Sequence, residues 1–242
     1  MTDTARPLCP IRMPELFPAT PRTWIAERLD LGEHGSAELS RFILSLYFRP
    51  LCGYAQASSL RELGEPDELV SGFLANRLAR PDYLHGWRDA GGMPLRRWLM
   101  NGLHLYGHEL RRARGNREGR LAPLDSAAAA TAPEPGGIAA MERAWALAVV
   151  REACEEIESE LRGAGTERDW YVFRRHFIDG RSYRELYDET GVEPAKSAVR
   201  SHAILVKLRS RIRTLLARDG TPADEIEREI GRLQRTVEER IA

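Results

Sequence analysis

Apolar residues recur at helical spacing through most of the chain. Between Leu39 and Leu51 they stand three and four positions apart, as on the buried side of a helix. A second helix is expected to begin at Pro66 and to end near Pro81, because proline suits a first turn and interrupts a helix interior. No stretch shows the strict alternation typical of a β-strand. The pattern therefore predicts an all-α protein.

Two segments lack this periodicity. Residues 1–22 contain five prolines, which predicts an N-terminal arm rather than a helix. Residues 115–137 are rich in glycine, alanine and proline, which predicts a flexible linker. We therefore expect two small helical domains joined by this linker, at residues 23–114 and 138–218. A C-terminal amphipathic helix is expected within residues 219–242.

The stretch from Tyr183 to Arg213 predicts two helices joined by a tight turn. Ser182 can cap the first helix, Gly191 can adopt the left-handed conformation that ends it, and Pro194 suits the start of the second. A short helix, a glycine turn and a basic second helix form a helix-turn-helix, which lays its second helix into the major groove of DNA. The plainer alternative is a pair of helices with a solvated basic face.

Charge is unevenly distributed along the chain. The 36 basic and 36 acidic residues balance to a net charge of zero, which argues against a basic coat over the whole protein. Residues 88–120, however, contain eight arginines and three acids, and residues 168–218 contain twelve basic residues and six acids. Between them, residues 125–167 contain nine acids and three arginines. Positive charge is therefore concentrated in two helical segments.

The residue spacing needed for catalysis or metal binding is missing. Cys9, Cys52 and Cys154 are far apart, so neither a zinc site nor a disulfide framework is indicated. The histidines are scattered, and there is no phosphate-binding loop or nucleophile elbow. We expect a protein that is not an enzyme and has no catalytic residues, metal or cofactor. No apolar run reaches membrane-spanning length and no signal pattern is present, so we expect a cytoplasmic protein with no membrane partner.

Five stretches occur in an order that is similar to a known family. They are ELVSGFLANRLAR at 68–80, LRRWLMNGLHLYGHELRRARGNR at 95–117, LAPLD at 121–125, WALAVVREACEEI at 145–157, and SYRELYDETGV followed by AVRSHAILVKLRSRIRTLL at 182–216. With this order, residues 22–218 resemble the bacterial RNA polymerase sigma factors of the extracytoplasmic-function (ECF) type. The first two stretches resemble region 2 of that family, and the last three resemble the linker and region 4. The chain departs from the family at Ser71 and Gly72, where a glutamine and an acid are usual, and in a longer turn through Glu193–Lys196.

The resemblance implies a sigma factor that binds core RNA polymerase, recognises the minus-ten and minus-thirty-five promoter elements and helps to open the DNA. It assigns three sets of residues. The minus-thirty-five contacts are Lys196, Ser197, Arg200, Ser201 and His202, with Lys207 and Arg209 on phosphates. The minus-ten contacts are Arg96, Arg97, Trp98, Arg111, Arg112 and Arg114, and the polymerase contacts are Glu68, Leu69 and Phe73.

Two other functions remain open. One is a helix-turn-helix regulator that binds duplex DNA without polymerase. The other is a degenerate sigma-like interaction protein that acts through its C-terminal helix. An anti-sigma or other regulatory protein is a further partner that fits the N-terminal arm or the C-terminal helix.

Overall fold

Helices make up the regular structure of the residues that the computed structural model describes, which are 21–90, 92–117 and 133–241. Within these ranges there is no β-strand, which confirms the prediction of an all-α protein. The N-terminal arm, apart from its last two residues, and most of the predicted linker lie outside the described residues.

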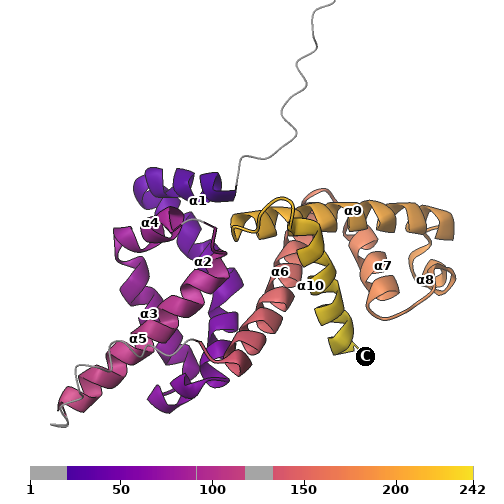
Figure 1. The fold of residues 1–242 in the computed structure, drawn as a ribbon. Helices are drawn as coiled ribbons and strands as arrows, with labels where there is room; N and C mark the ends of the chain where they lie inside the picture. The colour runs from indigo at the N-terminus through magenta and orange to yellow at the C-terminus, as the bar shows by residue number, and fades with distance from the viewer. Residues whose placement is uncertain (1–20, 91, 118–132, 242) are drawn as a thin grey trace, which may run out of the picture.

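The helices form two groups along the chain (Figure 1). The first group comprises α1 (Pro21–Asp30), α2 (Gly32–Gln56), the 3-10 helix η1 (Ser59–Leu63), α3 (Pro66–Leu78), α4 (Pro81–Asp89) and α5 (Leu95–Arg117). The second comprises α6 (Pro135–Gly163), α7 (Glu167–Phe177), α8 (Tyr183–Thr190), α9 (Pro194–Arg218) and α10 (Ile226–Ile241).

Proline begins helices in this chain more often than it ends them. Pro66, Pro81 and Pro194 each stand in the first turn of a helix, where a missing N–H has no helical partner to lose. Pro50 lies inside α2 and does not end it, since α2 continues to Gln56. The prolyl ring removes one backbone hydrogen bond there, while Tyr47 before it and Leu51 after it are buried in the core.

The larger hydrophobic core is built around α2 and the first half of α6. Tyr47 and Leu51 of α2 are fully buried, as are Trp145 and Val149 of α6. The core continues through α3, α4 and α5 on one side of α2. The predicted separation into two domains at residues 115–137 is therefore not a separation between cores, because α6 packs along α2.

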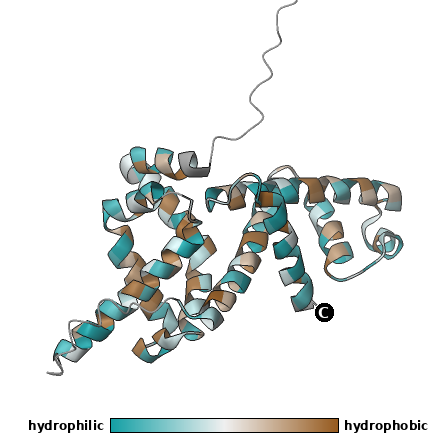
Figure 2. Ribbon diagram, viewed as in Figure 1, coloured by the Kyte–Doolittle hydropathy of each residue, from teal (hydrophilic) through white to brown (hydrophobic). Residues whose placement is uncertain are grey.

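A smaller core lies at the other end of α6. It contains Ile157 and Leu161 of α6, Trp170 and Phe173 of α7, and Ile204 of α9. The end of α9 returns to the larger core, which buries its last leucines and parts of α10. Figure 2 shows hydrophobic and hydrophilic residues alternating along each of these ribbons, as expected for helices with one buried side. Both α6 and α9 thus connect the two cores.

Candidate nucleic-acid interface

The turn between α8 and α9 forms from local signals. The backbone N of Glu185 donates to Ser182 Oγ at 3.3 Å, and the backbone N of Ser182 donates to Glu185 Oε2 at 2.8 Å, which makes a capping box at the start of α8. Gly191 ends α8 with φ of 68°, a conformation that favours glycine. The expected roles of Ser182, Gly191 and Pro194 are confirmed.

One side of α9 is buried against α7 and α8. On this side Ser197 is 2% exposed and Ser201 is 1% exposed, in line with the buried Ile204. The hydroxyl of Ser197 donates to the carbonyl oxygen of Val192 at 3.4 Å. The sequence-based assignment of these two serines to base contacts is therefore wrong for this structure, because both face the interior.

The other sides of the first half of α9 face solvent. Lys196, Arg200 and His202 are all exposed there. Lys196 forms an ion pair with Glu193 at 3.1 Å, and Arg200 donates to Asp169 of α7 at 2.7 Å. The Lys196–Glu193 pair is exposed at both residues and therefore weak, so Lys196 can exchange its partner for another anion, whereas the side chain of Asp169 is only 15% exposed.

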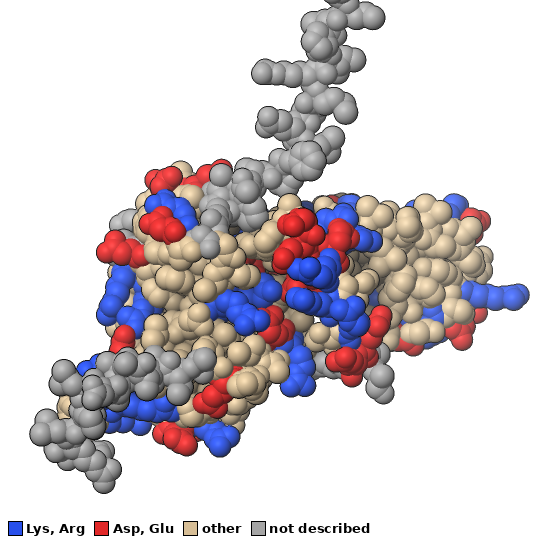
Figure 3. Space-filling model, in the orientation of Figure 1, with Lys and Arg blue, Asp and Glu red and all other residues tan. Residues whose placement is uncertain are grey.

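The second half of α9 carries its positive charge next to acids of other helices. Lys207 and Arg211 both pair with Glu160 of α6. Arg209 and Arg213 both pair with Glu227 of α10. Figure 3 shows positive and negative side chains mixed in the middle of the molecule, whereas the face at upper right is mostly uncharged. Lys207 and Arg209, expected to contact phosphates, are thus exposed but already paired with carboxylates.

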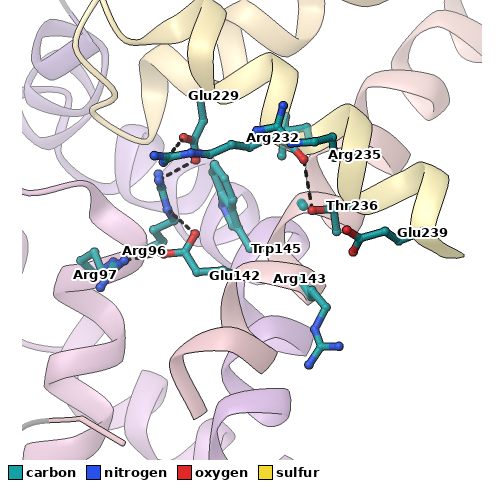
Figure 4. Close-up of a pocket in the computed structure, with 12 residues that line it drawn as sticks. Arg96, Arg97, Glu142, Arg143, Trp145, Glu229, Arg232, Arg235, Thr236 and Glu239 are labelled. Atoms are coloured by element: carbon teal, nitrogen blue, oxygen red, sulfur yellow. Dashed lines mark hydrogen bonds and ion pairs between the residues drawn. The ribbon is translucent and has the colours of Figure 1, made fainter. Parts of the chain in front are cut away.

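Arg96, at the start of α5, is only 7% exposed and lies in a cluster of acids (Figure 4). Its guanidinium donates to Glu142 at 3.1 Å, to Glu229 at 2.8 Å and to the carboxylate of Asp219. The same group lies over the ring of Trp145, 4.1 Å from the centroid.

Asp219 is the innermost acid of this cluster and is fully buried. It accepts hydrogen bonds from the hydroxyl of Tyr47 at 2.7 Å and from the backbone N of Arg96 at 2.9 Å. Burial raises the pKa of Asp219 to about 6, and the neighbouring positive charge of Arg96 partly offsets that rise. The cluster thereby joins α2, α5, α6, α10 and the segment that connects α9 to α10.

The assignment of Arg96 to minus-ten DNA is therefore wrong for this structure, since all its polar contacts are internal. Arg97 is exposed and pairs with Glu142 at 3.0 Å. Trp98 is half-buried and packs on Tyr83 with ring centroids 5.7 Å apart, so it does not present a free stacking face.

Two arginines near the end of α5 are likewise held by hydrogen bonds within the protein. Arg111 donates to the backbone carbonyl of Ser59 at 2.7 Å, and Arg114 donates to that of Leu63 at 2.6 Å. These bonds satisfy carbonyls of η1. Arg112, which lies between these two residues, is exposed.

The three residues expected to bind polymerase do not form one surface. Glu68 is exposed, but Leu69 and Phe73 are buried in the larger core. Phe73 meets Tyr83 and Tyr106 at centroid distances of 6.2 Å and 5.9 Å. The two apolar residues are therefore core residues of α3, and only Glu68 can reach a partner.

Sequence reasoning missed the acids that surround Arg96. Glu142, Asp219 and Glu229 lie 46, 123 and 133 residues away from it in the chain, and no local pattern connects them. Among the residues described, no three histidine, cysteine, aspartate or glutamate side chains are placed to hold a metal ion. No helix within residues 21–90, 92–117 or 133–241 is long and apolar enough to cross a membrane.

No protein-family model, curated protein or solved structure matches this chain. The resemblance to the sigma factors therefore rests on the five sequence stretches alone.

Proposed function

We propose that the protein is a transcription initiation factor of the sigma type that binds duplex DNA through the first half of α9. In this proposal α8, the turn at Gly191 and α9 act as a helix-turn-helix, with α9 entering the major groove. The observation that carries it is the exposed side of α9. This helix has no acidic residue from Pro194 to Arg218, and its first half directs Lys196, Arg200 and His202 to solvent.

The second part of the proposal concerns polymerase and the opening of DNA. It is supported by the similarity of α3 and α5 to region 2 and by the exposed residues Glu68, Arg97 and Arg112. Cationic side chains that project from a helix end supply phosphate contacts that are independent of sequence.

A duplex-binding regulator that does not recruit polymerase is the second candidate. Three of the expected contacts with polymerase or minus-ten DNA, namely Leu69, Phe73 and Arg96, are buried, which favours this candidate. The exposed side of α9 is common to both candidates.

Run-off transcription with core polymerase separates the candidates. A promoter-specific transcript supports the sigma factor, whereas duplex binding without transcript supports the regulator. If the full-length protein neither binds duplex DNA nor directs transcription, both are wrong.

A pair of double variants tests the binding surface itself. Lys196→Ala with Arg200→Ala removes two exposed cations of α9, and we expect duplex affinity to fall about tenfold or more. The control, Arg151→Ala with Arg162→Ala, removes the same charge from exposed positions on α6. Fluorescence anisotropy at fixed salt measures both. Equal losses in the two variants would contradict the assignment to α9.

A further inference from the structure

The line of α9 opposite its contacts with α7 and α8 is aliphatic. Ser197, Ser201 and Ile204 mark the buried side. With 3.6 residues per turn, positions 195, 199, 203 and 206 fall close to the opposite side. Val199 is 71% exposed and Val206 is 57% exposed, and Ala195 and Ala203 are also exposed. The basic residues therefore flank this line rather than form it.

Such an arrangement suits a ligand that is polyanionic and has small apolar groups. Lys196 and Lys207 lie on one flank of the line, and His202 lies on the other. Valine is a poor choice for an exposed helix position on propensity alone, because its branched side chain loses rotamer freedom in a helix. Because α9 has no acidic residue, a partner of mixed charge would leave its own cations unpaired on this helix.

The major groove of DNA offers one apolar group, the C5-methyl of thymine. We infer that Val199 and Ala203 read thymine methyl groups while the flanking cations hold phosphates, an inference that rests on the proposed binding of duplex DNA by α9. Residues four apart on a helix are separated by about 6 Å along its axis, which corresponds to about two base-pair steps. The preferred site thus has thymines at adjacent or next-but-one positions, on either strand.

Val206 provides a matched control on the same helix. It lies two turns beyond Val199 and borders an apolar groove between α9 and α10, which is also lined by Leu205, Ile230 and Leu233. The residues that reach base edges in a helix-turn-helix are at the N-terminal part of the second helix. Val206 is therefore expected to lie outside the base-reading part of α9.

The test uses the full-length protein and a pool of random duplexes. Selection of bound duplexes identifies preferred sites, which are then prepared with deoxyuridine in place of thymidine. This change removes only the methyl groups. We expect affinity to fall about fourfold for each contacted methyl, from about 0.8 kcal/mol per buried carbon.

The variants assign the effect to a residue. In Val199→Ala the loss caused by deoxyuridine should shrink to less than half of its wild-type size, whereas in Val206→Ala it should persist. The slope of affinity against salt should be the same in all three proteins, because no charge is changed. Circular dichroism checks that both variants remain helical, as expected for exposed positions.

Three outcomes would overturn the inference. Binding that is indifferent to deoxyuridine would show that α9 binds DNA without reading methyl groups, and the proposed function would stand. A loss of methyl sensitivity in Val206→Ala but not in Val199→Ala would place the contact elsewhere on α9. A folded protein that binds no duplex would overturn both this inference and the proposed function.

Discussion

Two helices of this protein carry runs of arginine, and the structure uses them in opposite ways. At the start of α5, Arg96 is surrounded by three carboxylates and an indole ring. Along the first half of α9, Lys196 and Arg200 face solvent and have one carboxylate each. The two segments are similar in charge along the sequence, yet Arg96 is enclosed by carboxylates whereas Lys196 and Arg200 are exposed.

The difference lies in where the acids come from. Arg96 is matched by acids from α6, α10 and the segment after α9, so its charge serves to fasten these elements to α5. The cations of α9 also pair with acids of α6, α7 and α10, but their side chains stay about half exposed. A positive segment in a sequence thus indicates a ligand surface only when the fold leaves its cations exposed.

The largest expected effect comes from removing the buried arginine of α5. Arg96→Ala leaves Asp219 buried without its cation, which should lower the free energy of unfolding by about 3–5 kcal/mol. Urea denaturation followed by circular dichroism measures this change. Arg97→Ala is the control, because Arg97 is adjacent but exposed, and its loss should be at most about 1 kcal/mol. Equal losses would mean that the cluster does not hold the fold together.

A smaller effect follows from the titration of Asp219. Burial raises its pKa to about 6 in the folded protein, from an ordinary value of 3.8. Between these pH values the folded protein keeps a proton that the unfolded chain has released. Its contribution to the free energy of unfolding therefore falls as the pH rises from about 4 to 6, by at most about 1.4 kcal/mol per pH unit.

Asp219→Asn isolates this contribution, because the other carboxyl groups titrate in both proteins. The difference in unfolding free energy between wild type and variant should change in favour of the variant as the pH rises through this window. Urea titrations at pH 4, 5 and 6 measure it. A difference that is constant with pH, or that favours the wild type as the pH rises, would contradict the buried titration.

The smallest expected effect comes from removing an acid that pairs with the cations of α9. Glu227 pairs with both Arg209 and Arg213, so Glu227→Gln frees two cations on α9. Duplex binding should tighten at low salt, and the slope of log affinity against log salt should steepen by about 1. The unfolding midpoint should not change, because the pairs are exposed.

Glu225→Gln is the matched control for that experiment. Glu225 precedes α10 and pairs with Arg228 rather than with a residue of α9. Its salt slope should equal that of the wild type. The same steepening in both variants would indicate a general effect of net charge and would remove the second half of α9 from the interface.

Local chemistry explains what could be predicted from the sequence. Ser182, Gly191 and Pro194 act within a few residues of where they stand, so the bounds of α8 and the start of α9 could be read from them. The helix that starts at Pro66 follows from proline placement and apolar spacing in the same way.

Long-range packing explains what could not be predicted. Ser197 and Ser201 alternate with basic and aliphatic residues. The spacing alone does not tell which polar positions of such a helix face inward. Arg96 finds its acids across more than a hundred residues, through a fold that no local signal specifies. The shared core of α2 and α6 likewise depends on how two distant helices meet.

The continuity of α6 has a consequence for spacing along DNA. Its 29 residues rise about 43 Å, and its two halves are anchored in different cores. The helix therefore fixes the distance between the α5 side of the molecule and α9. At 3.4 Å per base pair that length corresponds to about 13 base pairs. If duplex DNA is bound at both α5 and α9, as proposed, the two contacts have one permitted helical phase, because five inserted base pairs turn the second contact to the far side of the double helix.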